Sequence, residues 1–273
     1  MKTKLTDESL SSRRRPQRML GRVAQFCTVA FAASLASLGV YVALDSEAAH
    51  SVARGTTASA EVRTVTRAAR RADFGGESPS PEARHIADWV ADSGDNRGMP
   101  FVIVDKANGR VFVFSPAAAI TGAAPALLGL ARGDDSVPGI GEREMSAILP
   151  EERTTPAGRF IAERGRNYHG EDIVWIDYDA AVSMHRVRAT NPAERRLQRL
   201  ASSTADDNRI SYGCINVPVD FFDRVVAPAF SATNGVVYVL PETRSAQTVF
   251  GSYDVATRAR SASLRQPFRG NNL

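Results

Sequence analysis

An uncharged run near the N-terminus divides this chain into parts that require different surroundings. Residues 23–44 (VAQFCTVAFAASLASLGVYVAL) hold no acidic or basic side chain. As a helix, such a run would span roughly 33 Å, which is enough to cross the apolar core of a bilayer. Seven Lys and Arg residues precede it against two acidic ones, whereas Asp45 and Glu47 follow it. This asymmetry predicts that residues 1–22 stay in the cytoplasm and that the rest of the chain is exported.

Two forms of export remain open for this segment. The run is longer than the roughly 7–15 apolar residues of a usual signal peptide, which favours an uncleaved signal anchor. It is also rich in Ala and Ser, and Ser46-Glu47-Ala48 supplies small residues of the kind found at a cleavage site. A buried core helix fits less well, because the arginines gather on one side of the run only. We therefore expect either a membrane anchor or a cleaved signal peptide.

The positive charge lies at the two ends of the chain. The formal net charge is +4, yet residues 1–22 and 252–273 together hold eleven Lys and Arg residues against three acidic ones. Residues 23–251 are therefore mildly acidic. The basic residues are nearly all Arg, and no aromatic residues alternate with them as they do on surfaces that stack bases. We expect no nucleic-acid partner.

Composition also suggests where the folded body begins and ends. Residues 45–80 lack apolar periodicity and end in Gly, Ser and Pro, which is typical of a flexible linker. Residues 252–273 form a polar, basic tail that we expect to fray after Tyr253. The folded domain is expected over residues 81–251.

Local patterns within that body favour a mainly β domain with a few helices. Ser80 before Pro81 is a typical helix start, and a helix over 81–92 would align Ile86, Trp89 and Val90. Two apolar runs joined by an Asn-Gly turn predict a hairpin of Phe101–Asp105 with Arg110–Phe114. Further strands are expected at 159–162, 173–177, 181–185 and 236–240, and long loops over 115–150. Further helices are expected at 192–201, with Leu197 and Leu200 inward, and at 219–226.

One thiol stands out in the exported part. If Cys27 lies in the anchor or is removed, Cys214 has no disulfide partner in its own domain. It lies in the segment RISYGCINVP, just before an expected helix. Gly213 allows an unusual backbone conformation, and the amides of Gly213 and Cys214 are candidates for binding an oxyanion.

A thiol needs a base to become a good nucleophile, and the body offers three histidines. His85 lies in the first expected helix, where a structural role fits better. His169 lies in a loop, and His185 ends a strand from which a side chain can be aimed rigidly. From the residues alone, a Cys–His enzyme and a buried structural cysteine stay about equally open.

The segment around Cys214 resembles the active-site signature of the L,D-transpeptidase (YkuD-type) catalytic domain. That signature runs Ser or Thr, any residue, Gly, Cys, an apolar residue, then Arg or Asn. It is matched here by Ser211, Gly213, Cys214, Ile215 and Asn216. Residues 154–160 (TTPAGRF) resemble the Thr-Pro-x-Gly-x-Phe segment of the family, and residues 101–114 resemble its opening strands. Together these matches cover about residues 100–241.

The resemblance implies roles for individual residues. Cys214 would be the nucleophile, His185 the general base and acid, and the backbone amides of Gly213 and Cys214 the oxyanion site. The residues expected to support the site are Ser211, Tyr212 and Asn216. In the family the histidine is usually followed by Gly, whereas Arg186 follows it here, and residues 191–208 form an insertion before the cysteine.

The resemblance also implies a fold and a reaction. The fold would be a mainly β sandwich or barrel with a few short helices, on the periplasmic side of the cell envelope. Its partners would be peptidoglycan stem peptides, whose terminal D-alanine is released as a thioester forms on the cysteine. An amine of a neighbouring stem, an outer-membrane protein side chain or water would then accept the acyl group. No metal or organic cofactor is needed.

Other interpretations remain beside this one. Three nearby arginines are candidates for binding stem carboxylates, although most surface arginines are simply solvated: Arg186, Arg188 and Arg209. A non-catalytic peptidoglycan-binding envelope protein with a degenerate site is the alternative function, and only the His185-Arg186 pair favours it. A redox thiol protein ranks last, because the exported part has no second cysteine to resolve a disulfide.

Overall fold

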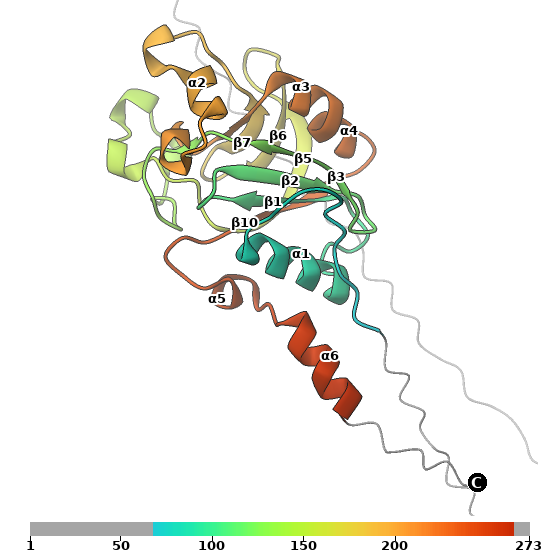
Figure 1. Ribbon diagram of the computed structural model, residues 1–273. Coiled ribbons are helices and arrows are strands. Elements are labelled where there is room, and N and C mark those ends of the chain that lie inside the picture. Colours follow the sequence, from blue (N-terminus) through green and yellow to red (C-terminus); the bar gives the residue numbers. More distant parts are fainter. Residues whose placement is uncertain (1–67, 265–273) are drawn as a thin grey trace, which may run out of the picture. The chain divides into compact units, whose positions relative to one another are not determined.

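Eight strands form one mixed sheet in the part of the chain that this computed structural model describes, residues 68–264 (Figure 1). Their order across the sheet is β3-β2-β1-β10-β5-β6-β7-β9, and β4 pairs with β8 in a small second sheet. The strands are β1 (Phe101–Asp105), β2 (Arg110–Phe114), β3 (Ile120–Pro125), β4 (Leu128–Gly129), β5 (Gly158–Arg166), β6 (Asp172–Asp177), β7 (Val182–Arg186), β8 (Arg209–Ser211), β9 (Ile215–Val217) and β10 (Gly235–Val239). The mainly β class is confirmed for this part of the chain.

The helices are short and lie around the sheet. They are α1 (Pro81–Ser93), α2 (Arg196–Ala201), α3 (Val219–Phe221), α4 (Ala227–Ala229), α5 (Ala246–Phe250) and α6 (Val255–Leu264). A π-helical turn (Phe222–Val226) joins α3 to α4. Short 3₁₀ turns lie at Ile140–Glu142, Met145–Ala147, Pro150–Glu152, Pro192–Glu194 and Ala205–Asn208.

Helix α1 begins as its sequence predicts. The hydroxyl of Ser80 accepts a hydrogen bond from the Ala83 amide at 3.1 Å, and Pro81 occupies the first helical position. Ile86 and Val90 are fully buried. This apolar face packs on the sheet, so α1 is held mainly by burial of that face.

The predicted hairpin is also confirmed, and it lies inside the sheet. Strand β1 pairs antiparallel with β2 and parallel with β10, with Phe101 opposite Phe114. The rings of those two residues stack with centroids 4.6 Å apart. Gly109 closes the turn at φ 58°, a conformation that favours glycine.

Apolar side chains fill both faces of the sheet. One cluster lies between the sheet and the α3–α4 segment and includes Val104, Val113, Val174, Met184, Ile215 and Phe222. The other lies beneath α1 and includes Ile86, Trp89, Phe101, Phe112, Phe114 and Tyr238. Figure 1 shows α1 on one side of β1 and β10 and α3 with α4 on the other. Each strand of the hairpin therefore alternates between two cores and is buried on both faces.

The two ends of the sheet approach each other. Leu127, which follows β3, and Asn216 of β9 exchange backbone hydrogen bonds of 2.8 and 2.9 Å. This bridge joins the first and last strands of the order, so the sheet is nearly closed. The bridge also fixes the position of Asn216, which lies close to the predicted nucleophile in the sequence.

Four expectations about local structure need correction. Residues 115–150 contain β3 and β4 rather than loops alone, because β3 pairs with β2 at the edge of the main sheet and β4 pairs with β8 in the small second sheet. The helix expected over 192–201 breaks at Arg195, where φ is 51°, so Leu197 is 57% exposed and only Leu200 turns inward. The expected linker already packs at Phe74, and the expected frayed tail forms α6, anchored by the buried Val255.

The predicted membrane segment 23–44, its basic flank and Cys27 lie outside the described residues. Among residues 68–264, no helix is both long enough and apolar enough to cross a bilayer.

Candidate active site

Strand pairing brings His185 next to the loop that carries Cys214. The loop joins β8 to β9, and β9 runs parallel to β7 with His185 opposite Asn216. Only Ile215 lies between Cys214 and Asn216, so this register places the histidine close to the thiol. The half-buried Cys214 is a free thiol.

The alternation of side chains along β7 decides what faces the thiol. Val182 and Met184 point into the core, so Ser183 and His185 point to the opposite face. His185 and the thiol of Cys214 interact closely enough to shift each other's pKa. The sulfur lies 3.7 Å from the hydroxyl of Ser183, and the thiol donates to the Ala181 carbonyl at 3.6 Å. Sequence reasoning missed Ser183, although the period of two along the strand places it beside His185.

A backbone carbonyl orients the histidine. The Nδ1 of His185 lies 2.8 Å from the carbonyl oxygen of Arg186. A carbonyl only accepts, so Nδ1 carries a proton and Nε2 is left to take the proton of the thiol. Residue 186 contributes only its main-chain carbonyl to this contact, so the contact does not depend on the side chain at that position.

The two groups shift each other's pKa in opposite directions. Burial alone would raise the pKa of Cys214, but the hydrogen bond and charge of His185, with help from Ser183, lower it overall. Burial alone would lower the pKa of His185, but Cys214 and the Arg186 carbonyl raise it overall. Both shifts favour a thiolate beside an imidazolium, which is the reactive form of such a pair.

Two side chains hold the carbonyl of Cys214. The hydroxyl of Ser211 donates to it at 2.6 Å, and the side-chain amide of Asn216 donates at 3.1 Å. Both residues are almost fully buried. Two of the three predicted support residues, Ser211 and Asn216, therefore make a definite contact, which fixes the peptide plane that follows Cys214.

Gly213 has a different role from the one expected. Its amide donates to the hydroxyl of Ser211 at 3.1 Å, so that proton is already used inside the loop. Its φ of 136° and a close approach to the Thr154 carbonyl leave no room for a side chain. The Gly213 amide is therefore not a donor for an oxyanion, and the amide of Cys214 stays a prediction.

Thr155 links the Thr-Pro segment to the nucleophile loop. Its hydroxyl donates to the carbonyl of Gly213 at 2.8 Å and accepts from the amide of Gly129 at 2.9 Å. Thr155 is fully buried. The two motifs that resemble the family thus meet through one hydroxyl.

Replacing Thr155 with valine is expected to lower the free energy of unfolding by about 2 kcal/mol, because two buried backbone groups lose their partner. Denaturant unfolding measures the change. Thr155→Ser, which keeps the hydroxyl, should lose much less. Equal losses in the two variants would show that the methyl group, and not the hydrogen bonds, matters here.

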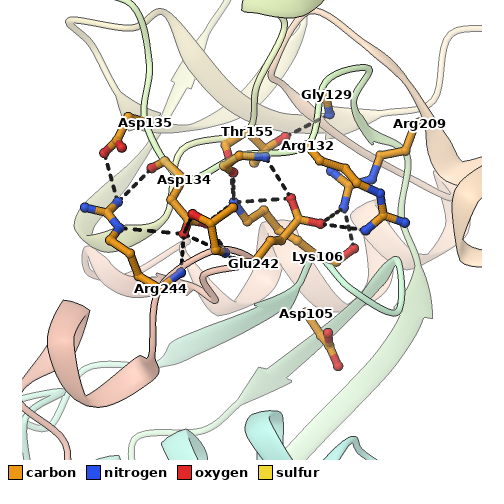
Figure 2. A network of polar contacts seen from close by, with 12 residues as sticks. Asp105, Lys106, Gly129, Arg132, Asp134, Asp135, Thr155, Arg209, Glu242 and Arg244 are labelled. Atoms are coloured by element: carbon orange, nitrogen blue, oxygen red, sulfur yellow. Dashed lines mark hydrogen bonds and ion pairs between the residues drawn. The ribbon is translucent and has the colours of Figure 1, made fainter.

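A buried lysine holds the backbone carbonyl of Thr155. Figure 2 shows Lys106 pointing between Asp134 and Glu242. Its ammonium lies 2.9 Å from the Thr155 carbonyl and 3.1 Å from Asp134. Arg209 joins the cluster through Glu242 and the Lys106 carbonyl. Burial lowers the pKa of Lys106, and the two carboxylates partly offset this effect.

Lys106→Met is expected to cost roughly 3 kcal/mol of stability, because it leaves buried carboxylates without their central cation. Chemical denaturation of this variant and of Arg244→Met provides the comparison. Arg244 pairs with the same Asp134 but is 41% exposed, so its loss should cost no more than about 1 kcal/mol. An unfolding free energy equal to that of the wild type in Lys106→Met would contradict the assignment.

The arginines predicted to bind carboxylates do not form a common site. Arg209 is buried in the Lys106 cluster, so its assignment is wrong. The guanidinium of Arg186 lies over the ring of Phe222 and pairs with Asp223, so it already has partners within the domain. Arg188 is exposed with Glu171 at 3.4 Å, and its assignment stays a prediction.

The remaining candidates lie away from the thiol or contact other groups. His85 hydrogen-bonds Ser252 at 3.0 Å, in keeping with a structural role. The exposed His169 contacts the ring of Tyr168 at a tilt of 40° in the β5–β6 loop. The ring of Tyr212 lies 4.0 Å from the guanidinium of Arg153, and its support of the site stays a prediction.

Comparison with solved structures finds a resemblance to an L,D-transpeptidase. The structure of LD transpeptidase LdtMt1 in complex with imipenem is 17% identical in sequence, with a TM-score of 0.31. The match covers 52% of this chain and 58% of that chain, so it spans little more than half of LdtMt1. No family model and no curated protein matches the sequence. The chemistry of the site therefore rests on its own geometry.

Proposed function

We propose that the protein is a cysteine-dependent L,D-transpeptidase that acts on peptidoglycan stem peptides. The observation that carries the proposal is the Cys214–His185 pair, in which the Arg186 carbonyl orients the imidazole. The sequence around Cys214, which resembles the family signature, supplies the substrate class. The N-terminal segment supports a place in the cell envelope, as an inner-membrane anchored or secreted protein.

In the first half of the reaction the Cys214 thiolate attacks the carbonyl carbon of a diamino-acid residue. The carbonyl electrons move to oxygen, and the Cys214 amide stabilises that charge. When the intermediate collapses, the bond to the terminal D-alanine breaks, and His185 gives its proton to the leaving amine. The products are a thioester on Cys214 and free D-alanine.

In the second half an acceptor attacks the thioester. His185 takes a proton from the acceptor, the carbon–sulfur bond breaks, and the thiolate–imidazolium pair is restored. An amine of a second stem yields a cross-link, and water yields a shortened stem. An outer-membrane protein amine remains a candidate acceptor.

The sheet face beside the thiol supports an extended substrate. Trp175 pairs across β6 and β7 with Ser183 and stacks on Tyr178, with ring centroids 5.0 Å apart. The hydroxyl of Tyr178, which is 60% exposed, donates to Glu163 on the neighbouring strand. This open aromatic surface is a place for the chain of the donor stem.

The alternative, a non-catalytic wall-binding protein, loses its main support. It depended on arginine in place of glycine after His185, yet only the main-chain carbonyl of Arg186 contacts the imidazole.

Imipenem, a carbapenem that can acylate such a thiol, tests the proposal. We expect the folded full chain to gain one imipenem mass, mapped to the peptide containing Cys214 rather than the one containing Cys27. Cys214→Ser is the control and should remain unmodified. A folded protein that gains no mass on Cys214 would favour the binding protein.

A further inference from the structure

The inserted residues 191–208 form a folded segment that is fixed to the domain. Helix α2 within it buries Leu200 against Leu127 and Val187. Arg199 donates to two main-chain carbonyls of the same segment, each at 2.9 Å. The segment therefore has a definite position beside the nucleophile loop.

Arg196 reaches from this segment to that loop. It lies in the first turn of α2, and its Nη1 donates to the Oδ1 of Asn216 at 2.7 Å. Its guanidinium also pairs with Glu194. Only 14% of the Arg196 side chain and 1% of Asn216 are exposed. A hydrogen bond so well shielded from water holds its partners more firmly than one on the surface.

Asn216 carries this contact on to the nucleophile. A carboxamide has one accepting end and one donating end, whereas arginine offers donors only. Arg196 therefore keeps the oxygen of Asn216 toward itself and the amide group toward the Cys214 carbonyl, 3.1 Å away. Without Arg196 the carboxamide is free to turn over, and its oxygen would then face the carbonyl oxygen of Cys214.

Charge gives Arg196 a second route to the site. Its positive charge opposes protonation of His185, against the stronger opposite effect of Cys214. Glu171, which Arg188 approaches, also interacts with His185. Arg196 can therefore act on the site through its hydrogen bond to Asn216 or through its charge on His185. Replacing Asn216 removes the first effect and leaves the second.

We propose that residues 191–208 are a positioning arm for the nucleophile loop, in which Arg196 holds Asn216 and, through it, the carbonyl of Cys214. The proposal rests on the proposed function, since it takes Cys214 as the reactive thiol. Ser211 holds the same carbonyl independently. Loss of Arg196 should therefore lower the reaction rate of the Cys214 thiol without abolishing its reaction.

Alkylation of Cys214 in the full chain tests the arm without any peptide substrate. We expect Arg196→Met to slow alkylation at neutral pH roughly tenfold, a modest loss for a misplaced reacting group. Arg196→Lys, which keeps a charge and a donor, should recover part of the rate. Arg195→Met is the matched control, because it removes a neighbouring exposed arginine and should react like the wild type.

A double-mutant cycle separates the contact from the charge. Adding Arg196→Met to Asn216→Ala should cause little further loss if the arm works through Asn216. Additive losses, or a wild-type rate in Arg196→Met, would overturn the proposal. Should Arg196→Met fail to fold by circular dichroism, Arg196→Leu, which also lacks a donor, takes its place with the same expected result.

Release of D-alanine from a stem peptide, measured on the same variants, keeps the two proposals distinct. Arg196-dependent alkylation without D-alanine release would support the arm and contradict the transpeptidase. Release of D-alanine with no dependence on Arg196 would support the transpeptidase and overturn the arm.

Discussion

Cys214→Ser is expected to lower the rate of D-alanine release from a tetrapeptide stem at least about a thousandfold. A serine hydroxyl keeps the size of the thiol but is not ionised near neutral pH, so the attacking thiolate is lost. Other residues make the contacts that hold the loop, so the fold should remain. Liquid chromatography of the released D-alanine measures the effect.

Thermal unfolding of the same variant is the control for that result. A melting temperature close to that of the wild type, together with the lost activity, assigns the loss to chemistry. Residual release within tenfold of the wild type would mean that another group is the nucleophile. It would also remove the reason for the pairing of His185 with Cys214.

His185→Ala is expected to lower D-alanine release about a hundredfold or more, the usual range for a general base and acid. It should also move the pH profile of Cys214 alkylation to higher pH. His185 lowers the pKa of this thiol, so without it burial dominates and the thiol pKa rises. In the wild type, reactivity is present above the lowered thiol pKa and is lost as the pH falls through it.

His169→Ala provides the matched comparison for the base. His169 lies in the exposed β5–β6 loop and contacts the ring of Tyr168, so its removal should leave the alkylation profile unchanged. Mass spectrometry of the Cys214 peptide across pH records both variants. An unshifted profile in His185→Ala, with a shift in His169→Ala, would reverse the assignment.

Local signals predicted the parts of the fold whose causes are local. The hydroxyl of Ser80, the ring of Pro81 and the turn at Gly109 each act within a few residues, so α1 and the first hairpin lie where the sequence places them. The prediction of one helix over 192–201 was wrong because Arg195 takes a left-handed conformation. The break changes which side chains of the segment face the domain, and the spacing of apolar residues alone does not reveal such a break.

The site divides in the same way. The sequence made Cys214 and His185 candidates, because a lone thiol in a distinctive motif and a histidine at a strand end are visible along the chain, and the resemblance implied their roles. Ser183 and Arg196 became visible only with strand pairing and the fold of the insertion. Arg209 was assigned to the substrate because its burial against Glu242 depends on a contact with a distant part of the chain.

The most direct measurement of the central claim is the intact mass of the full chain mixed with a tetrapeptide stem that ends in a diamino-acid–D-alanine pair. The proposed function predicts a transient gain equal to the stem less D-alanine, located on Cys214 and absent from Cys214→Ser. Binding of the stem with no gain in mass and no released D-alanine would contradict it.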